Sequence, residues 1–131
     1  MARSFATMLM FEGDAEEAMN LYVSLFSGAE ITRLERYGPG EQGEAGSVKR
    51  AEFTLGGHRL MCINSPVKHQ FTFTPSISIF VECADEAEQM TAYTRLSDGG
   101  MVLMPLDHYD FSERFGWVND RFGVSWQLNL Q

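Results

Sequence analysis

The chain has 131 residues, of which 44% are hydrophobic and 21% charged, as in an ordinary globular domain. Eighteen acidic against ten basic residues give a formal net charge of −8, which disfavours nucleic acids and anionic membrane surfaces as partners. No apolar run approaches the ~18–20 residues that a membrane-spanning helix needs.

The first half predicts a strand, a helix and three further strands. Residues 5–11 form an apolar run too short for a long helix, which favours a buried strand. A helix is expected to begin at Asp14, with Glu17 at capping-box spacing, and to end at Gly28. Further strands are expected at residues 31–37, 48–55 and 58–64, with a loop at 38–46 and a tight turn at Gly56–Gly57.

The second half predicts the same order of elements. A strand is expected at 76–81, and a helix begins at Asp85, has Glu88 three residues on, and closes at Gly99. Further strands are expected at residues 101–106, 115–119 and 124–130, and residues 107–114 are expected to form a polar and aromatic loop.

An internal repeat organises these elements. A shift of 71 residues superposes the two helix starts, the two tyrosines Tyr22 and Tyr93, and the two closing glycines. The chain therefore predicts one α+β domain over 1–131, built from two tandem β-α-β-β-β modules at 1–64 and 76–131 with a linker at 65–75. Each module covers one sheet face with its helix, so the two uncovered faces could curl around a shared cavity for a small ligand.

The expected compartment is the cytoplasm. The N-terminal residues do not form a secretory signal. Cys62 and Cys83 are too few and too far apart for a disulfide scaffold or a CxxC motif, and we expect both to be buried structural thiols.

Several stretches resemble a known family. They are Phe11–Ala18 (FEGDAEEA), Leu21–Tyr22, Phe53–His58 (FTLGGH) and above all Arg114–Leu128 (RFGWVNDRFGVSWQL). Over essentially its whole length the chain is similar to the vicinal oxygen chelate superfamily of glyoxalases, bleomycin-resistance proteins and extradiol dioxygenases. Within it, the chain resembles the PhnB-like branch, labelled demethylubiquinone methyltransferase-like. The resemblance implies a curled half-barrel sheet, a homodimer and a ligand pocket.

The resemblance also implies where a metal would bind in this superfamily. The corresponding positions lie near Thr7 and Ser78, within one residue, on the first strand of each module, and near Met61 and Gln127 on the last. Hard divalent ions prefer carboxylate or imidazole ligands, which none of these residues supplies. We therefore expect no metal and no cofactor. The histidines His58, His69 and His108 could still be recruited as ligands, but they share no common spacing, and we expect them to be surface residues without partners.

Other residues are candidates for lining a pocket. If Ala51, Phe53 and Leu55 pack under the helix, Arg50 and Glu52 face the pocket, where they orient a polar substrate, supply a base, or form only a cross-strand ion pair. Tyr109, Phe111 or Trp117 could stack on a planar ligand, unless residues 107–114 are simply a packed loop. The predicted pocket-lining residues are Thr7, Arg50, Glu52, Met61, Ser78, Tyr109, Trp117 and Gln127.

These observations favour a small-molecule-binding protein that is independent of metals and whose ligand is apolar or aromatic. One alternative is a metal-dependent lyase, isomerase or dioxygenase of the same superfamily. A further alternative is the methyltransferase that the family label suggests. The absence of a glycine-rich loop after a strand disfavours a dinucleotide or S-adenosylmethionine fold.

Overall fold

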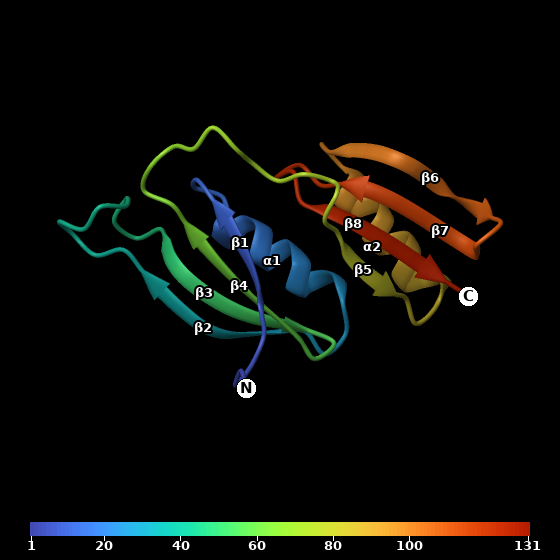
Figure 1. Cartoon of the computed structure of the whole chain (residues 1–131), viewed down its shortest axis with the longest axis horizontal. Coiled ribbons are helices and arrows are strands. Elements are labelled where there is room, and N and C mark those ends of the chain that lie inside the picture. Colours follow the sequence, from blue (N-terminus) through green and yellow to red (C-terminus); the bar gives the residue numbers. More distant parts are fainter. The chain divides into compact units, whose positions relative to one another are not determined.

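The repeated β-α-β-β-β order is present twice in the computed structural model, which describes residues 1–131 (Figure 1). The chain divides into two units, Met1–His69 and Gln70–Gln131. The first unit contains β1 (Thr7–Phe11), α1 (Ala15–Leu25), β2 (Glu30–Arg36), β3 (Val48–Leu55) and β4 (His58–Asn64). The second contains β5 (Ile79–Glu82), α2 (Glu86–Ser97), β6 (Met101–Tyr109), β7 (Ser112–Asn119) and β8 (Ser125–Leu130).

Each unit has one mixed four-stranded sheet, and the two sheets share one topology. The strand order is β1-β4-β3-β2 in the first and β5-β8-β7-β6 in the second. The first strand of each unit runs parallel to the last, and the remaining pairs are antiparallel. The predicted α+β class is therefore confirmed, with the repeat expressed strand for strand.

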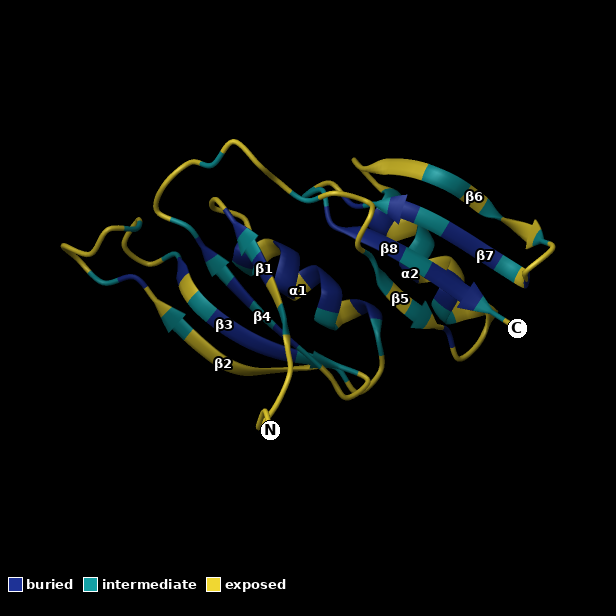
Figure 2. Cartoon of the chain, viewed as in Figure 1, coloured by how far each residue is buried: buried dark blue, intermediate teal, exposed yellow.

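The helix of each unit buries one face of its own sheet. On β3, Ala51 and Phe53 are buried as predicted, and the ring of Phe53 lies 6.3 Å from that of Tyr22 on α1. On β8, Trp126 and Leu128 are fully buried. The edge strands β2 and β6 are largely exposed (Figure 2). Because side chains alternate along a strand, the residues between the buried ones belong to the face opposite the helix, here called the open face of each sheet.

The second helix begins as the sequence predicts. The Asp85 carboxylate accepts a hydrogen bond from the Glu88 amide at 2.8 Å, and the Glu88 carboxylate accepts one from the Ala84 amide at 2.9 Å. These reciprocal bonds satisfy backbone donors that a helix start leaves without partners. With 11 and 12 residues, neither helix has the length and apolarity needed to cross a membrane.

The predicted cap of the first helix is wrong. The Asp14 side chain makes no capping hydrogen bond. Instead, the Asn64 side-chain oxygen at the end of β4 accepts from the amides of Gly13 and Ala15, both at 3.0 Å. Because β4 pairs with β1, Asn64 lies beside the chain where β1 leads into the helix, and it replaces the local cap.

Several strand boundaries also differ from the prediction. The strand expected at 76–81 is observed at Ile79–Glu82, where its parallel pairing with β8 begins at Ile79 and Trp126. The loop expected at 107–114 is the end of a hairpin, in which Tyr109 pairs with Ser112 across a two-residue turn. Asp107 and His108 belong to the exposed edge strand β6, and Ser112 to Arg114 begin the inner strand β7.

Candidate functional site

The open face of the first sheet is mostly charged along β2 and β3 and mostly apolar along β4 and β1. Strand pairing places Arg33, Glu52, Met61 and Met8 in one row across β2, β3, β4 and β1. The next row consists of Glu35, Arg50, Ile63 and Met10. The predicted residues Arg50, Glu52 and Met61 thus lie together on this face.

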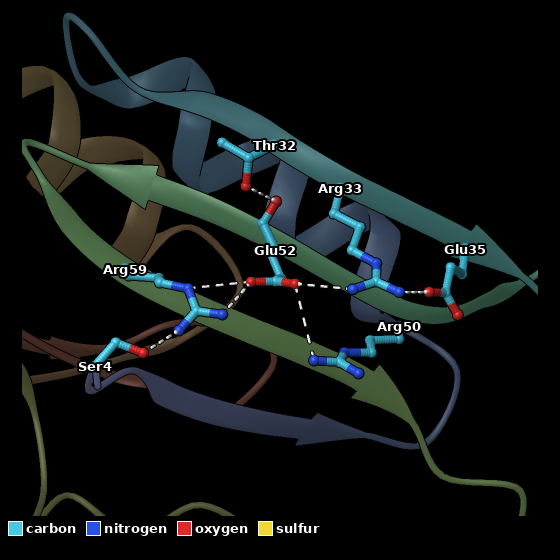
Figure 3. Close-up of polar contacts among 7 residues, drawn as sticks. All are labelled: Ser4, Thr32, Arg33, Glu35, Arg50, Glu52 and Arg59. Carbon is cyan, nitrogen blue, oxygen red and sulfur yellow. Dashed lines mark hydrogen bonds and ion pairs between the residues drawn. The ribbon is translucent and has the colours of Figure 1, made fainter. Parts of the chain in front are cut away.

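Glu52 is the centre of the charged side (Figure 3). Only 8% of this residue is exposed, and three arginines surround its carboxylate. Its Oε1 accepts hydrogen bonds from Nε and Nη2 of Arg59. Its Oε2 lies 3.7 Å from Arg33 Nη1 and 3.8 Å from Arg50 Nη2. The cross-strand ion pair that the sequence offered as an alternative is therefore present, between β3 and β4.

The arginines determine the protonation of Glu52. The hydrogen bond from Arg59 is the main cause that lowers the pKa of the Glu52 carboxyl below its ordinary value near 4.5, and burial only partly opposes it. A carboxylate with a lowered pKa is a weak proton acceptor. The arrangement therefore favours Glu52 as an anchor for the arginines over the general base that the sequence left open.

Thr7 lies apart from the other predicted residues of the first unit. It pairs with Leu60, which is fully buried on the helix side, so it belongs to the same side of the sheet. Its hydroxyl lies 3.1 Å from Nε2 of His58. The open-face positions of β1 are those of Met8 and Met10.

The open face of the second sheet holds a network of hydroxyl, amide and indole groups. The hydroxyls of Ser78 and Ser125 lie 2.7 Å apart. The indole of Trp117 donates to Ser125 at 2.8 Å, and the Gln127 amide donates to Ser78 at 3.3 Å. The structure thus brings the predicted residues Ser78, Trp117 and Gln127 together through Ser125.

Aromatic rings adjoin this network on the same unit. Tyr109 and Phe111 stack at 5.6 Å across the hairpin turn, and both meet the edge of Phe115 at 6.1 and 5.0 Å. Phe80 on β5 lies 6.4 Å from Phe115 and is 53% exposed. Sequence reasoning missed Phe80 and Phe115 as site candidates, although their alternation with helix-facing residues was a usable signal.

The expectation of partnerless histidines is wrong. His58 contacts Thr7, and His69 Nε2 lies 2.9 Å from the Ser65 hydroxyl. His108 Nδ1 lies 3.3 Å from the backbone oxygen of Glu113 across the β6–β7 hairpin. Only the partner of His58 is distant in the sequence; Ser65 lies four residues from His69, and Glu113 lies five residues from His108.

The residues present do not fit a divalent metal. The positions implied by the superfamily offer two hydroxyls, a thioether and an amide, and the Ser78 hydroxyl already serves Ser125 and Gln127. No group of three or more His, Cys, Asp or Glu side chains lies close enough together to hold an ion. Hard ions need several charged or strongly polar oxygen ligands, which this set does not supply.

The two cysteines are buried, as expected. Burial raises the pKa of the Cys62 thiol to about 11. Burial, with a smaller contribution from the nearby carboxylates of Glu88, Glu82 and Asp85, raises the pKa of Cys83 to about 12. Since the thiolate is the nucleophile, neither cysteine is prepared for covalent catalysis.

A separate cavity of about 180 Å³ lies near the start of α1 in the first unit and contains none of the predicted site residues. Tyr37 forms part of its wall and donates a hydrogen bond to the backbone oxygen of Asn64 at 2.8 Å. Gly43 lies against the Tyr37 ring. The charged residues that line this cavity, Glu12 and Glu44, are both acidic.

Comparison with known proteins gives one family and one fold. A family model described as 3-demethylubiquinone-9 3-methyltransferase matches residues 3–129. No curated protein matches the chain. The PhnB protein of Bacillus cereus is 51% identical, with a TM-score of 0.95, over 98% of this chain and 100% of its own.

More distant structures share the fold. PA1353 from Pseudomonas aeruginosa is 26% identical, with a TM-score of 0.83, over 99% of this chain and 98% of its own. The fosfomycin resistance protein FosX from Mesorhizobium loti is 14% identical, with a TM-score of 0.63, over 100% of this chain and 94% of its own. At that identity the likeness to FosX concerns the fold alone.

Proposed function

We propose that this chain, which belongs to the PhnB-like 3-demethylubiquinone-9 3-methyltransferase family of the vicinal oxygen chelate superfamily, binds a small apolar or aromatic molecule without a metal. Each open face is a candidate binding surface by itself: Arg50, Glu52 and Met61 would contact a ligand in the first unit, and Ser78, Tyr109, Trp117 and Gln127 would contact one in the second. We further propose that the protein is a homodimer, as the resemblance implies, and that it works in the reducing cytoplasm, in keeping with its two free cysteines.

The observation that carries this proposal is the pairing of exposed aromatic rings with polar donors on the second sheet. Phe80 and Phe111 are 53% and 60% exposed, although each ring could bury a large area. Beside Phe80, on the strand that pairs with β5, the Gln127 amide is only half-buried and retains hydrogen-bonding capacity. Ligand sites commonly combine a mostly apolar surface with a few such polar groups.

Native mass spectrometry of the freshly purified protein tests metal independence and subunit number together. We expect a dimer that carries no divalent ion, even after exposure to nickel, zinc, manganese and ferrous iron. One ion per subunit that is lost in Gln127→Ala would overturn metal independence. Methyl transfer from S-adenosylmethionine to a quinone precursor would replace binding by the activity in the family's description.

A neutral aromatic probe tests the binding face itself. N-phenyl-1-naphthylamine is expected to bind the wild-type protein with enhanced fluorescence, and Phe80→Ser is expected to weaken binding by roughly tenfold through loss of an aromatic contact. Ile77→Ser is the matched control, because Ile77 is 68% exposed but precedes β5. Equal binding by both variants, or no binding by the wild type, would overturn the proposal.

A further inference from the structure

Arg50 carries a buried donor that nothing in the structure satisfies. Its Nε is shielded from solvent and has no hydrogen-bond acceptor. Its guanidinium approaches Glu52 only at 3.8 Å, which is beyond hydrogen-bond distance. Buried donors without an acceptor are rare in native proteins, and a ligand that binds there is one explanation.

The neighbouring arginines differ from Arg50 in this respect. Arg59 directs Nε and Nη2 to Glu52 and lies 3.3 Å from the Ser4 hydroxyl through Nη1. Arg33 pairs with Glu35 beside it on β2. Figure 3 shows Arg50 joined to the same carboxylate by an ion pair, at 3.8 Å and without a hydrogen bond.

The cluster has an unbalanced charge. Its cations are Arg33, Arg50 and Arg59, and its anions are Glu35 and Glu52, which leaves one net positive charge within the cluster itself; Glu30, which pairs with Thr54 at the Arg59 end of the same face, lies outside it. The whole chain has a net charge of −8, so this is a local excess against the trend of the molecule. One carboxylate would neutralise it, and a guanidinium binds a carboxylate through two parallel hydrogen bonds.

The surface beside Arg50 is apolar. Ile63 on β4 lies next to Arg50 on β3, and Met10 on β1 lies next to Ile63. The adjacent row contributes Met61 and Met8, and Met8 is 48% exposed. Methionine side chains adapt to irregular apolar shapes, so this side suits a hydrocarbon body of variable form.

We propose that Arg50 binds the carboxylate of an organic acid whose apolar body lies along Ile63 and the methionines of β1 and β4. This inference rests on the proposed function, since it names the ligand class that the first sheet takes. Glu52, held by Arg59, keeps the Arg50 side chain on the open face, where 40% of it is exposed and a carboxylate can approach the guanidinium.

A matched pair of probes tests the carboxylate. 4-Phenylbutyrate and 4-phenylbutanol share one apolar body and differ in charge. By calorimetry, we expect the acid to bind the wild type ~10-fold more tightly than the alcohol, with a preference that falls as salt rises. Methyl spectra of ¹³C-methionine protein are expected to shift at Met8, Met10 and Met61.

Two substitutions assign the preference to Arg50. Arg50→Gln is expected to bind acid and alcohol equally, and Arg50→Lys, which keeps the charge but lacks the planar pair of donors, to lose most of the preference. Lys49→Gln, which removes the same charge from an exposed neighbour on β3, is expected to keep it. Melting curves verify that each variant is folded.

The failures are distinguishable. If acid and alcohol bind the wild type equally, or if Arg50→Gln keeps the preference, the carboxylate assignment is wrong while binding to the sheets stands. If inorganic phosphate displaces the acid as well as an excess of the acid does, the site takes phosphate rather than an organic carboxylate. If neither phenyl probe nor the naphthylamine binds, the proposed function fails as well.

Discussion

Replacing Asp120 with asparagine tests the turn that leads into β8. Asp120 is 3% exposed, and its Oδ1 accepts from the amides of Phe122 and Val124 at 2.9 and 3.0 Å. Its Oδ2 accepts from the indole Nε1 of Trp126 at 3.0 Å. In Asp120→Asn one of these positions becomes an NH₂ group. In either orientation of the new side-chain amide, its NH₂ group faces an N–H donor, either the backbone amides or the indole.

The expected loss follows from the bonds concerned. A hydrogen bond to a charged group contributes ~1.5–3 kcal/mol, and a buried donor left without an acceptor costs a similar amount. We therefore expect Asp120→Asn to lower the free energy of unfolding by ~3 kcal/mol and Tm by ~10 °C. Urea unfolding followed by far-ultraviolet circular dichroism measures the change in the free energy of unfolding.

A double-mutant cycle identifies the cause. Trp126→Phe removes the indole donor and destabilises the core, because Trp126 is fully buried. Adding Asp120→Asn to that variant should cost less than it costs the wild type, with a coupling of ~1–2 kcal/mol. Strict additivity, or an Asp120→Asn protein as stable as the wild type, would show that the carboxylate does not organise this turn.

Three further outcomes are expected. Gly43→Ala should lower Tm by several degrees and change the fluorescence of Tyr37, because the added methyl overlaps that ring; an unchanged melting curve would contradict the close packing. Cys62 and Cys83 should react with a thiol reagent in the folded protein only at the rate of unfolding, because burial raises the pKa of both thiols; rapid labelling at neutral pH would show that one is accessible. The hydrogen bond from Arg59 lowers the pKa of Glu52 in the folded protein, so the ionised Glu52 stabilises the fold above about pH 4.5, and this stabilisation is lost as the pH falls through the lowered pKa. Glu52→Gln should therefore show a smaller drop in Tm than the wild type over that acidic range, and an equal drop would refute the linkage.

The sequence predicted the parts of the fold that short-range signals determine. The strands at 48–55 and 58–64 match β3 and β4 residue for residue, because alternation marks each strand and two glycines mark the turn. Gly56 and Gly57 both adopt positive φ, 54° and 85°, as a tight hairpin of this kind requires. The Asp85 cap is equally local, since donor and acceptor lie three residues apart.

The misses involve partners that are distant in sequence. Asn64 replaces Asp14 at the start of α1 from about fifty residues away, and no local pattern announces it. Arg33 and Arg59 reach Glu52 from neighbouring strands, so the sequence offered Arg50 and Glu52 as a pair but not the cluster. The register of β1 moved the open-face position from Thr7 to Met8, a one-residue shift that changes the face of every side chain.

The family motif at Arg114–Leu128 joins two requirements in one segment. Asp120 and Trp126 bond to each other inside the fold, whereas Trp117, Ser125 and Gln127 belong to the open face. Since side chains alternate along β7 and β8, one run of residues supplies both the packing and the candidate ligand contacts.

Such a motif identifies a family because packing against the helix constrains the half of its residues that face inward. The ligand depends on the other half, and there the two repeats diverge: Met61 of the first sheet corresponds to Gln127 of the second. The repeat therefore predicts a common frame, while the chemistry of each open face has to be tested unit by unit, with Arg50 in the first and Phe80 in the second.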